Sequence, residues 1–469
     1  MRKFLIVGVL LIAFAIQPLA SADGAEKTSV YTVTMNYEFQ NTGPGQAKNV
    51  NAMIYLFDNI SGWANQQILS ERIYVDETQI SPTISRTEDN SWTTVSVGDI
   101  SEGSSKTISV TQTLKVSAVE FSINPSAVGT YFPPDVQTYT SPISGLFESD
   151  NPAIQALANQ IVGNETNPYL KAKRIFENVI AYLQYERQTE EHSALWAYNS
   201  KKGDCTEFSN MFIALARAVG IPVKAVSGFG YLPLYSLASA STSVTGIGHA
   251  WAIAYLPNYG WVPVDAVWPE GVGSFGELDY DHIVGATTSG NDVVKNGRIY
   301  WPGPGDTSYT WTYVGTRPTV NLTWGGQIAP EVFIEPTLST ASVVQDSILK
   351  FYVTVKNSGR QNVTNLQVEL SADNTYFEVP AAQSISSLAA GNNQVLTFDV
   401  KVKGGVENST VTAHVTYDSS YGTFIAEGQR TVNITIGAPS EGASNMMLLA
   451  LIGVVIGLVV VVAIALLRR

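Results

Sequence analysis

The stretch KKGDCTEFSNMFIALARAVGIP, residues 201–222, decides which fold the sequence predicts, and it contains Cys205, the single cysteine of the 469-residue chain. Asp204 is a suitable helix N-cap, and Glu207 follows at the spacing of a capping box. Apolar residues then recur at helical spacing and predict one buried face: Phe208, Met211, Phe212, Leu215 and Val219. A Gly-Ile-Pro sequence ends the helix. The stretch therefore predicts a helix with Cys205 in its first turn.

A thiol in the first turn of a helix is well placed for nucleophilic chemistry. The unpaired N–H groups and the helix dipole favour the thiolate. The carboxylates of Asp204 and Glu207 oppose it, so we expect activation of Cys205 to depend on a histidine. A lone cysteine is otherwise most often a small buried hydrophobic residue. The residues alone leave that alternative open.

His249 is the histidine whose position relative to a carboxylate can be predicted. It opens a predicted strand, HAWAIAYL, which a PNYG turn joins to the next strand. If Tyr255 pairs with Trp261, Asp265 faces Trp251 and lies diagonal to His249 on the same face of the sheet. A shift of one residue would place the two side chains on opposite faces. Cys205, His249 and Asp265 then supply a nucleophile, a base and an orienting carboxylate for attack on an amide carbonyl.

The residues around this set resemble the transglutaminase-like superfamily. The matching segments are GDCTEFSNMFIALARAVGIPVKAVSGFGY and HAWAIAYLPNYGWVPVDAVW. Their pattern is Gly-x-Cys, a helix ending near Gly-Ile-Pro, His-x-Trp on one strand and Asp on the next. The resemblance covers residues 150–300 and implies a papain-like core with a catalytic triad of Cys205, His249 and Asp265. It leaves the reaction open, because such domains occur in transglutaminases, proteases, peptide N-glycanases and inactive copies.

Further residues are candidates for the oxyanion hole and for the lining of the substrate cleft. The backbone N–H of Cys205 is expected to be one donor of the oxyanion hole. Two side chains are candidates for the second donor: Trp196 and Gln184. Tyr185 is a candidate for the same role and, with Trp251, for the lining of the substrate cleft.

The remaining histidines have no predicted catalytic role. His192 lacks a His or Cys at metal-ligand spacing and is expected in a solvated turn. His282 is expected to be structural, and His414 lies in the last β-domain. We therefore expect neither a metal ion nor a cofactor.

Both ends of the chain predict an exported protein anchored in the cell membrane. Residues 1–22 have the basic start, short apolar run and small-residue site of a signal peptide. Residues 446–467 are uncharged, apolar and followed by two arginines, which predicts a single transmembrane helix with the bulk of the protein outside the cytoplasm. A tail that is processed and exchanged for another anchor is the alternative. In this location Cys205 has no disulfide partner in the chain.

The expected fold class is multidomain α+β, with a central papain-like core flanked by two β-sandwiches and a C-terminal transmembrane helix. Alternating apolar residues indicate the sandwiches, and cap-plus-proline starts at Asn151 and Asn167 indicate the helices of the core. The expected segments are a signal peptide (1–22), an N-terminal β-sandwich (23–145), a transglutaminase-like domain (146–326), an immunoglobulin-like sandwich (327–437), a linker (438–445) and the transmembrane helix (446–467).

The sequence thus predicts a cysteine-dependent acyl-transfer enzyme that acts on protein or peptide amides, with hydrolysis favoured over cross-linking. The alternative is a surface adhesion or scaffold protein that uses the papain-like domain for binding without turnover. The net charge of −13 and the lack of a basic stripe argue against nucleic-acid binding. Protein or peptide substrates and the membrane are the expected partners, and the oligomeric state is left open.

Overall fold

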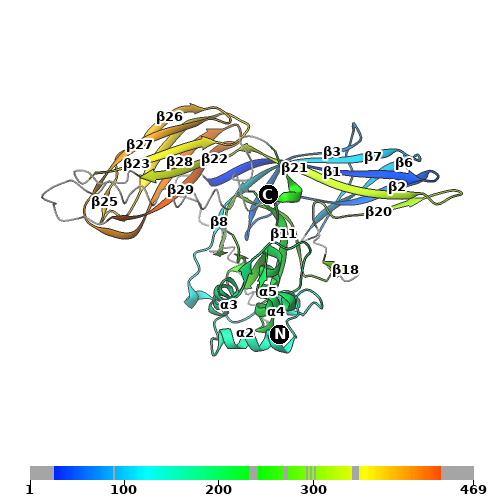
Figure 1. Cartoon of the computed structure of the whole chain (residues 1–469), viewed down its shortest axis with the longest axis horizontal. Coiled ribbons are helices and arrows are strands. Elements are labelled where there is room, and N and C mark those ends of the chain that lie inside the picture. The colour runs from blue at the N-terminus through cyan, green and yellow to red at the C-terminus, as the bar shows by residue number, and fades with distance from the viewer. Residues whose placement is uncertain are drawn as a thin grey trace, which may run out of the picture. The chain divides into compact units, whose positions relative to one another are not determined.

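The computed structural model describes residues 26–87, 90–231, 241–268, 273–291, 294–295, 298–299, 303–340 and 348–434. Three predicted segments lie outside the described residues: the signal peptide (1–22), the linker (438–445) and the transmembrane helix (446–467). The chain divides into two compact units, Met1–Phe333 and Ile334–Arg469. Figure 1 shows the elements of each unit.

The first unit contains a β-sandwich whose strands come from two distant parts of the chain. Its first sheet has the order β12 (Thr242–Ser243), β21 (Thr319–Val332), β1 (Glu26–Gly43), β7 (Ser105–Ser117), β3 (Asn65–Val75) and β4 (Thr78–Ile80). Its second sheet has the order β20 (Thr307–Thr312), β2 (Ala47–Leu56), β6 (Ser91–Ile100) and β5 (Ile84–Arg86). Alternate side chains of both sheets are buried in one core, as expected for antiparallel sheets with one face exposed to solvent. The predicted domain boundary at 326/327 falls inside β21.

The helical region of this unit, residues 146–291, combines four helices with a five-stranded antiparallel sheet. The helices are α2 (Pro152–Val162), α3 (Pro168–Tyr182), α4 (Ala194–Ser200) and α5 (Cys205–Ala218). The sheet has the order β15 (Ser274–Phe275), β14 (Gly260–Asp265), β13 (Gly248–Leu256), β11 (Val223–Gly230) and β17 (His282–Thr288). Asn151 and Asn167 cap α2 and α3 as predicted, each with proline at the first helical position.

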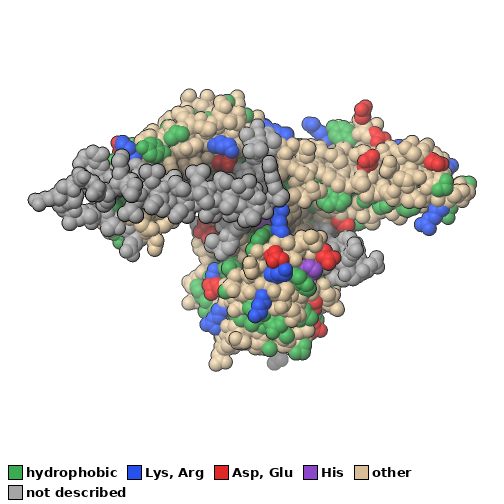
Figure 2. All heavy atoms as spheres, viewed as in Figure 1, with side chains coloured by type: hydrophobic (Ala, Val, Ile, Leu, Met, Phe, Trp, Pro, Cys, Tyr) green, Lys and Arg blue, Asp and Glu red, His purple; other side chains and the backbone are tan. Residues whose placement is uncertain are grey.

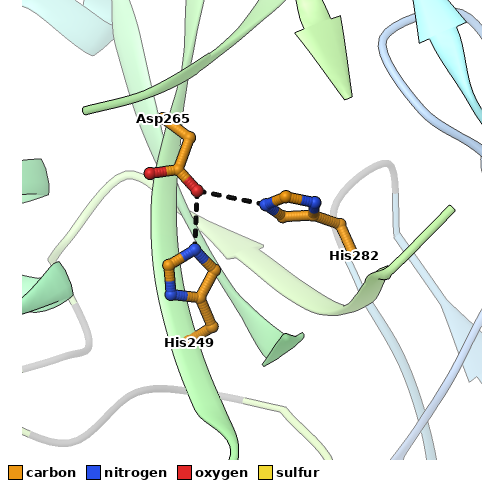
Figure 3. Close-up of side chains that lie close together, drawn as sticks. All are labelled: His249, Asp265 and His282. Carbon is orange, nitrogen blue, oxygen red and sulfur yellow. Dashed lines mark hydrogen bonds and ion pairs between the residues drawn. The ribbon is translucent and has the colours of Figure 1, made fainter. Parts of the chain in front are cut away.

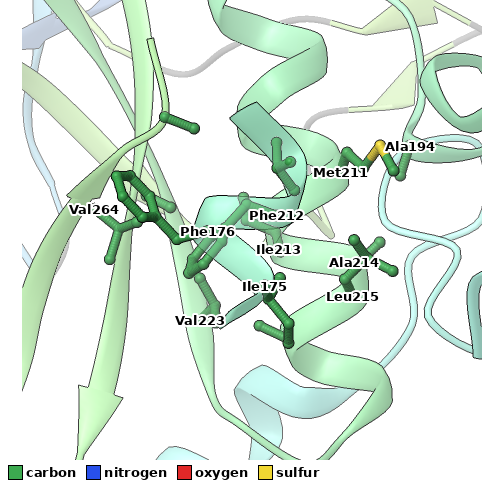
Figure 4. Packing of buried hydrophobic residues seen from close by; sticks show 14 of the residues in the cluster. Ile175, Phe176, Ala194, Met211, Phe212, Ile213, Ala214, Leu215, Val223 and Val264 are labelled. Atoms are coloured by element: carbon green, nitrogen blue, oxygen red, sulfur yellow. The ribbon is translucent and has the colours of Figure 1, made fainter. Parts of the chain in front are cut away.

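Helix α5 is the centre of the helical region and is buried on all sides. Residues from Thr206 to Arg217 are all buried, although the sequence predicts only one apolar face. Figure 4 shows its side chains packed among those of α3, β11 and β14. Burying a large apolar side chain stabilises a fold by about 1.5–3 kcal/mol. This packing therefore fixes the position of the helix that begins with Cys205.

Short elements connect these layers. Strand β9 (Gln184–Tyr185) pairs in parallel with β10 (Lys202–Gly203), which places Tyr185 beside the residues that precede α5. The others are β8 (Val119–Glu120) with β16 (Glu277–Leu278), β18 (Val294–Lys295) with β19 (Arg298–Ile299), helix α1 (Pro134–Gln137), and 3-10 turns at Pro125–Ala127, Thr138–Thr140 and Val244–Gly246.

The second unit consists of two antiparallel sheets. One has the order β22 (Ile334–Thr340), β23 (Ile348–Asn357), β27 (Asn393–Val402) and β25 (Phe377–Glu378). The other has the order β26 (Gln383–Leu388), β24 (Val363–Ser371), β28 (Val406–Ser419) and β29 (Gly422–Ile434). Alternate residues are buried along the strands, as in a β-sandwich.

The expected fold class needs correction. The structure is mostly β, with 54% of residues in strands and 16% in helices, so α+β does not describe the protein as a whole. The reason is that the two sandwiches contribute many long strands, whereas the helices are confined to one region. Among the described residues, no helix has the length and apolar character needed to cross a membrane.

Candidate active site

The hairpin of β13 and β14 brings His249 to Asp265. Tyr255 pairs with Trp261, so the predicted register is confirmed. The Nε2 atom of His249 lies 2.6 Å from Oδ2 of Asp265, and both side chains are almost completely buried. Figure 3 shows the imidazole of His249 pointing at the carboxylate. Because a neutral or charged ring can bond an ionised carboxylate only by donating, Nε2 carries a hydrogen and Nδ1 is the atom left for another partner.

Cys205 lies next to His249 at the start of α5. The two residues line one cavity, and Cys205 contributes to the raised pKa of His249. One turn along the helix, the hydroxyl of Ser209 donates to the carbonyl oxygen of Ala250 at 3.0 Å. This bond ties the first turns of α5 to the strand residue that follows His249. The structure therefore brings Cys205, His249 and Asp265 together.

The charges of the site favour an imidazolium at His249. Burial opposes the charged ring, but the Asp265 carboxylate and Cys205 outweigh it and raise the pKa of His249 to about 9. Burial also opposes an ionised Asp265, yet the two neighbouring histidines hold its pKa well below the usual range. Asp265 consequently stays ionised and cannot take a proton from His249 at neutral pH.

Asp265 is held by four hydrogen bonds. Its Oδ1 accepts from the backbone N–H groups of Val267 at 2.8 Å and Trp268 at 3.1 Å. Its Oδ2 accepts from His249 and, at 3.1 Å, from Nε2 of His282. A buried carboxylate needs such partners, because burying an unpaired charge is very costly.

His282 is the member of this cluster that the sequence interpretation placed outside the active site. Its ring lies 5.4 Å from that of His249, measured between ring centroids. Its other nitrogen, Nδ1, lies 2.7 Å from Oδ1 of Asp279. The sequence holds one local signal for this contact, the i, i+3 spacing of Asp279 and His282. Nothing in that spacing indicates that β17 lies two strands away from β13.

The capping box predicted at the start of α5 is present. Oδ1 of Asp204 accepts from the N–H of Thr206, and the Glu207 carboxylate accepts from the N–H groups of Asp204 and His192, both at 2.8 Å. Burial raises the pKa of Glu207 well above that of a surface glutamate. Glu207 therefore opposes a thiolate at Cys205 less than the sequence indicates.

The cavity beside Cys205 has a volume of about 540 Å³. Its lining comes from both parts of the first unit, including Tyr185 from the helical region and Trp324 from sandwich strand β21. Of the predicted residues, Tyr185 lines it, whereas Gln184, Trp196 and Trp251 are not among the described residues that do. Trp196 instead stacks on His192, and Trp251 is fully buried behind His249.

Two groups in the described part of the chain contain residue types that can bind metal ions. One is His249, Asp265 and His282, and the other is Glu191, Asp204 and Glu207. In the first group, the nitrogen and oxygen atoms that would bind a metal are joined to each other by hydrogen bonds. In the second, Glu207 and Asp204 accept from backbone N–H groups. Hydrogen bonding thus accounts for the first cluster, and the expected lack of a metal or cofactor stays a prediction.

The surface face in Figure 2 carries Lys and Arg side chains singly or in small groups among Asp and Glu. No continuous basic stripe is visible among the described residues of that face. The absence of nucleic-acid binding stays a prediction.

Comparison with known proteins identifies two segments. Residues 155–266 match the transglutaminase-like superfamily, and residues 329–436 match the family CARDB. An uncharacterised protein of Haemophilus influenzae is 29% identical over 130 residues, which cover 24% of this chain and 35% of that protein. The match therefore spans about a third of the length of this curated relative.

The solved structures that match this chain have low sequence identity and TM-scores below 0.5. A protein of Cytophaga hutchinsonii, named as a candidate cysteine protease, is 16% identical with a TM-score of 0.42, covering 65% of this chain and 98% of its own. The periplasmic domain of TgpA from Pseudomonas aeruginosa is 13% identical with a TM-score of 0.25, covering 50% and 88%. The transglutaminase of red sea bream is 9% identical with a TM-score of 0.25, covering 85% and 94%. These low scores do not establish the activity.

We expect Gly203→Ala to displace the start of α5. A Cβ at this position would lie 2.2 Å from Cβ of Glu207, and that atom cannot move without the helix backbone. Crowding of this kind costs about 1–3 kcal/mol. Urea unfolding should show this loss, and alkylation of Cys205 should slow.

Gly325→Ala is the control, because a Cβ there has no neighbour within 4 Å. It should leave the unfolding midpoint nearly unchanged. Equal midpoints for Gly203→Ala and the wild type would contradict the close contact.

Proposed function

Because residues 155–266 form a domain of the transglutaminase-like superfamily, we propose that this protein is a cysteine-dependent acyl-transfer enzyme acting on protein or peptide amides. The observation that supports the proposal most is the 2.6 Å contact between His249 and Asp265, with Cys205 beside His249 in one cavity. Cys205 is the nucleophile, His249 the general base and Asp265 the orienting carboxylate. The triad roles rest on this placement and on the chemistry of the three side chains.

In the resting site the proton of the Cys205 thiol lies on Nδ1 of His249, which the raised pKa of that ring favours. The thiolate sulfur attacks the amide carbonyl carbon, and the carbonyl electron pair moves to oxygen. When the tetrahedral intermediate collapses, the C–N bond breaks and the leaving amine takes the proton from His249. The acyl group is then held by Cys205 as a thioester.

The second step regenerates the thiol. A water molecule gives one proton to His249 while its oxygen attacks the thioester carbonyl. The C–S bond breaks, the carboxylic acid leaves and the sulfur recovers the proton. A primary amine in place of water would give a new amide, so the same residues support transamidation. We favour hydrolysis because of what the resemblance to the transglutaminase-like superfamily implies for its membrane-tethered members, not because of a particular residue.

We assign the oxyanion hole to the backbone N–H of Cys205 and the hydroxyl of Tyr185. The first residue of a helix has no intrahelical partner for its N–H. Tyr185 lines the cavity, and burial together with the nearby Cys205 raises its pKa to about 12, so the phenol keeps its proton at neutral pH. Arg187 acts in the opposite direction and lowers the pKa of the phenol. This assignment replaces Trp196 and Gln184, which lie away from the cavity.

The location outside the cytoplasm and the protein or peptide substrate stay predictions. The alternative function, a scaffold that binds without turnover, requires an unreactive thiol. The reactivity of Cys205 therefore separates the two functions.

We expect iodoacetamide to alkylate Cys205 at neutral pH at a rate that depends on His249. His249→Ala should lower the second-order rate constant by about 100-fold, since general bases contribute about 10²–10⁴-fold. The measurement is the mass increase of the protein against time. The control is His414→Ala, in which a histidine of the second unit is removed. Equal rates for wild type and His249→Ala would contradict the proposed function and favour a scaffold.

A peptide mixture incubated with a labelled primary amine should distinguish hydrolysis from transamidation. We expect mass spectrometry to find hydrolysed amides without incorporated amine. Amine incorporation that requires Cys205 would overturn the preference for hydrolysis while retaining the thioester.

We expect Tyr185→Phe to slow acyl transfer without slowing alkylation. Release of nitrophenol from p-nitrophenyl acetate passes through an oxyanion and should fall by about 100-fold. Displacement of iodide from iodoacetamide forms no oxyanion, so its rate should not change. Tyr313→Phe, at an exposed tyrosine outside the cavity, is the control. Unchanged nitrophenol release in Tyr185→Phe would rule out Tyr185 as the second donor.

A further inference from the structure

Both ring nitrogens of His282 contact carboxylate oxygens. Nε2 lies 3.1 Å from Oδ2 of Asp265, and Nδ1 lies 2.7 Å from Oδ1 of Asp279. An ionised carboxylate only accepts hydrogen bonds, so each nitrogen must carry a hydrogen. His282 is thus an imidazolium, and its side chain is only 1% exposed.

We propose that His282 is a positioning residue of the active site, which holds Asp265 in the orientation that His249 needs, and that Asp279 supplies its counter-charge. This inference rests on the proposed function, because it assigns His282 a role through the triad. Figure 3 shows the rings of His249 and His282 approaching the same oxygen of Asp265 from different strands.

Glycines in β11 stand opposite both histidines. Strand β11 lies between β13 and β17, with Gly228 opposite His249 and Gly230 opposite His282. Strands two positions apart are separated by about 9.5 Å, yet the ring centroids of the two histidines are 5.4 Å apart. A Cβ at Gly228 would lie 2.1 Å from the carbonyl oxygen of Ile283 and 2.9 Å from the Trp251 ring, and one at Gly230 would lie 2.8 Å from the Trp268 ring. The aromatic side chains that surround the two histidines therefore occupy the space above these glycines.

The bond from His282 fixes the carboxylate rather than merely neutralising it. With Oδ1 held by two backbone N–H groups, the remaining freedom of Asp265 is rotation that would move Oδ2 away from His249. The donor from His282 opposes that rotation. Correct orientation of a base by its carboxylate determines the tautomer that receives the thiol proton.

Asp279 prevents the charge of His282 from weakening the triad. An unbalanced cation beside Asp265 would reduce the attraction between that carboxylate and the His249 imidazolium. Asp279 lies against the opposite side of the His282 ring and is itself fixed by Nε1 of Trp268 at 2.9 Å and the N–H of Asp281 at 3.0 Å. Burial opposes the charged ring, but Asp279 and Asp265 raise the pKa of His282 to about 9.

Two substitutions separate positioning from a structural role. In a glutamine side chain the amide nitrogen can take the place of Nε2 of His282. In an asparagine side chain the amide nitrogen can take the place of Nδ1. His282→Gln should keep a donor to Asp265 and react like wild type. His282→Asn should keep only the bond to Asp279 and lower the iodoacetamide rate constant by about 10- to 100-fold, the range seen for the hydrogen-bond partners that orient metal ligands. A merely structural role would give the two folded variants the same iodoacetamide rate constant.

The control for these variants is His414→Gln. His414 also has a partner on each ring nitrogen, Ser371 and Glu427, each at 2.8 Å, but it lies in the second unit. It should react like wild type. If His282→Asn is folded and reacts at the wild-type rate, the positioning role is wrong. If the wild-type rate itself does not depend on His249, the proposed function fails instead.

A measurement on the unaltered protein covers the case in which His282→Asn does not fold. Histidine labelled with ¹⁵N gives ring signals from only four residues. The His282 ring, assigned from the spectrum of His282→Gln, should carry hydrogens on both nitrogens at pH 8 and lose one near pH 9. A ring with a single hydrogen at pH 7 would overturn the bridge between Asp265 and Asp279.

Discussion

The buried carboxylate of Asp265 is the constraint on which the structure of the helical region and its sheet depends. An ionised group with almost no solvent contact is tolerated only if its oxygens are fully bonded. Asp265 meets this condition with two backbone N–H groups and two imidazoles. The four partners come from β13, β17 and the turn after β14, so satisfying one carboxylate requires the sheet to be correctly assembled.

The position of helix α5 is the second constraint, because it places the thiol of Cys205 beside His249, whose Nδ1 is not used by Asp265. The helix is buried on all sides and begins at a capping box that Glu207 shares with the backbone of His192. Gly203 is needed because a side chain there would collide with Glu207. The Gly-x-Cys sequence is therefore explained by close packing at the helix start as well as by chemistry.

The N-terminal sandwich contributes to the cavity as well as to the core of its unit. Residues of β11 and β17 are buried in the same hydrophobic cluster as the sandwich strands. Gly305, which lines the cavity, donates its N–H to the Tyr37 hydroxyl of β1, and Trp324 of β21 lies against it. The cavity that exposes Cys205 thus has one wall from each part of the first unit.

Local features of this protein were predictable from sequence, and non-local ones were not. The capping box, the start of α5 and the pairing of Tyr255 with Trp261 depend on residues close in the chain, so their periodicity and turn signals determined them. The contact of His282 with Asp265 depends on β17 lying beside β11, and the burial of α5 on all sides depends on helices packing around it. The contribution of Trp324 to the cavity depends on β21 returning to pair with β1. Such contacts join residues far apart in sequence, and only tertiary structure decides them because no short-range pattern records which strands become neighbours.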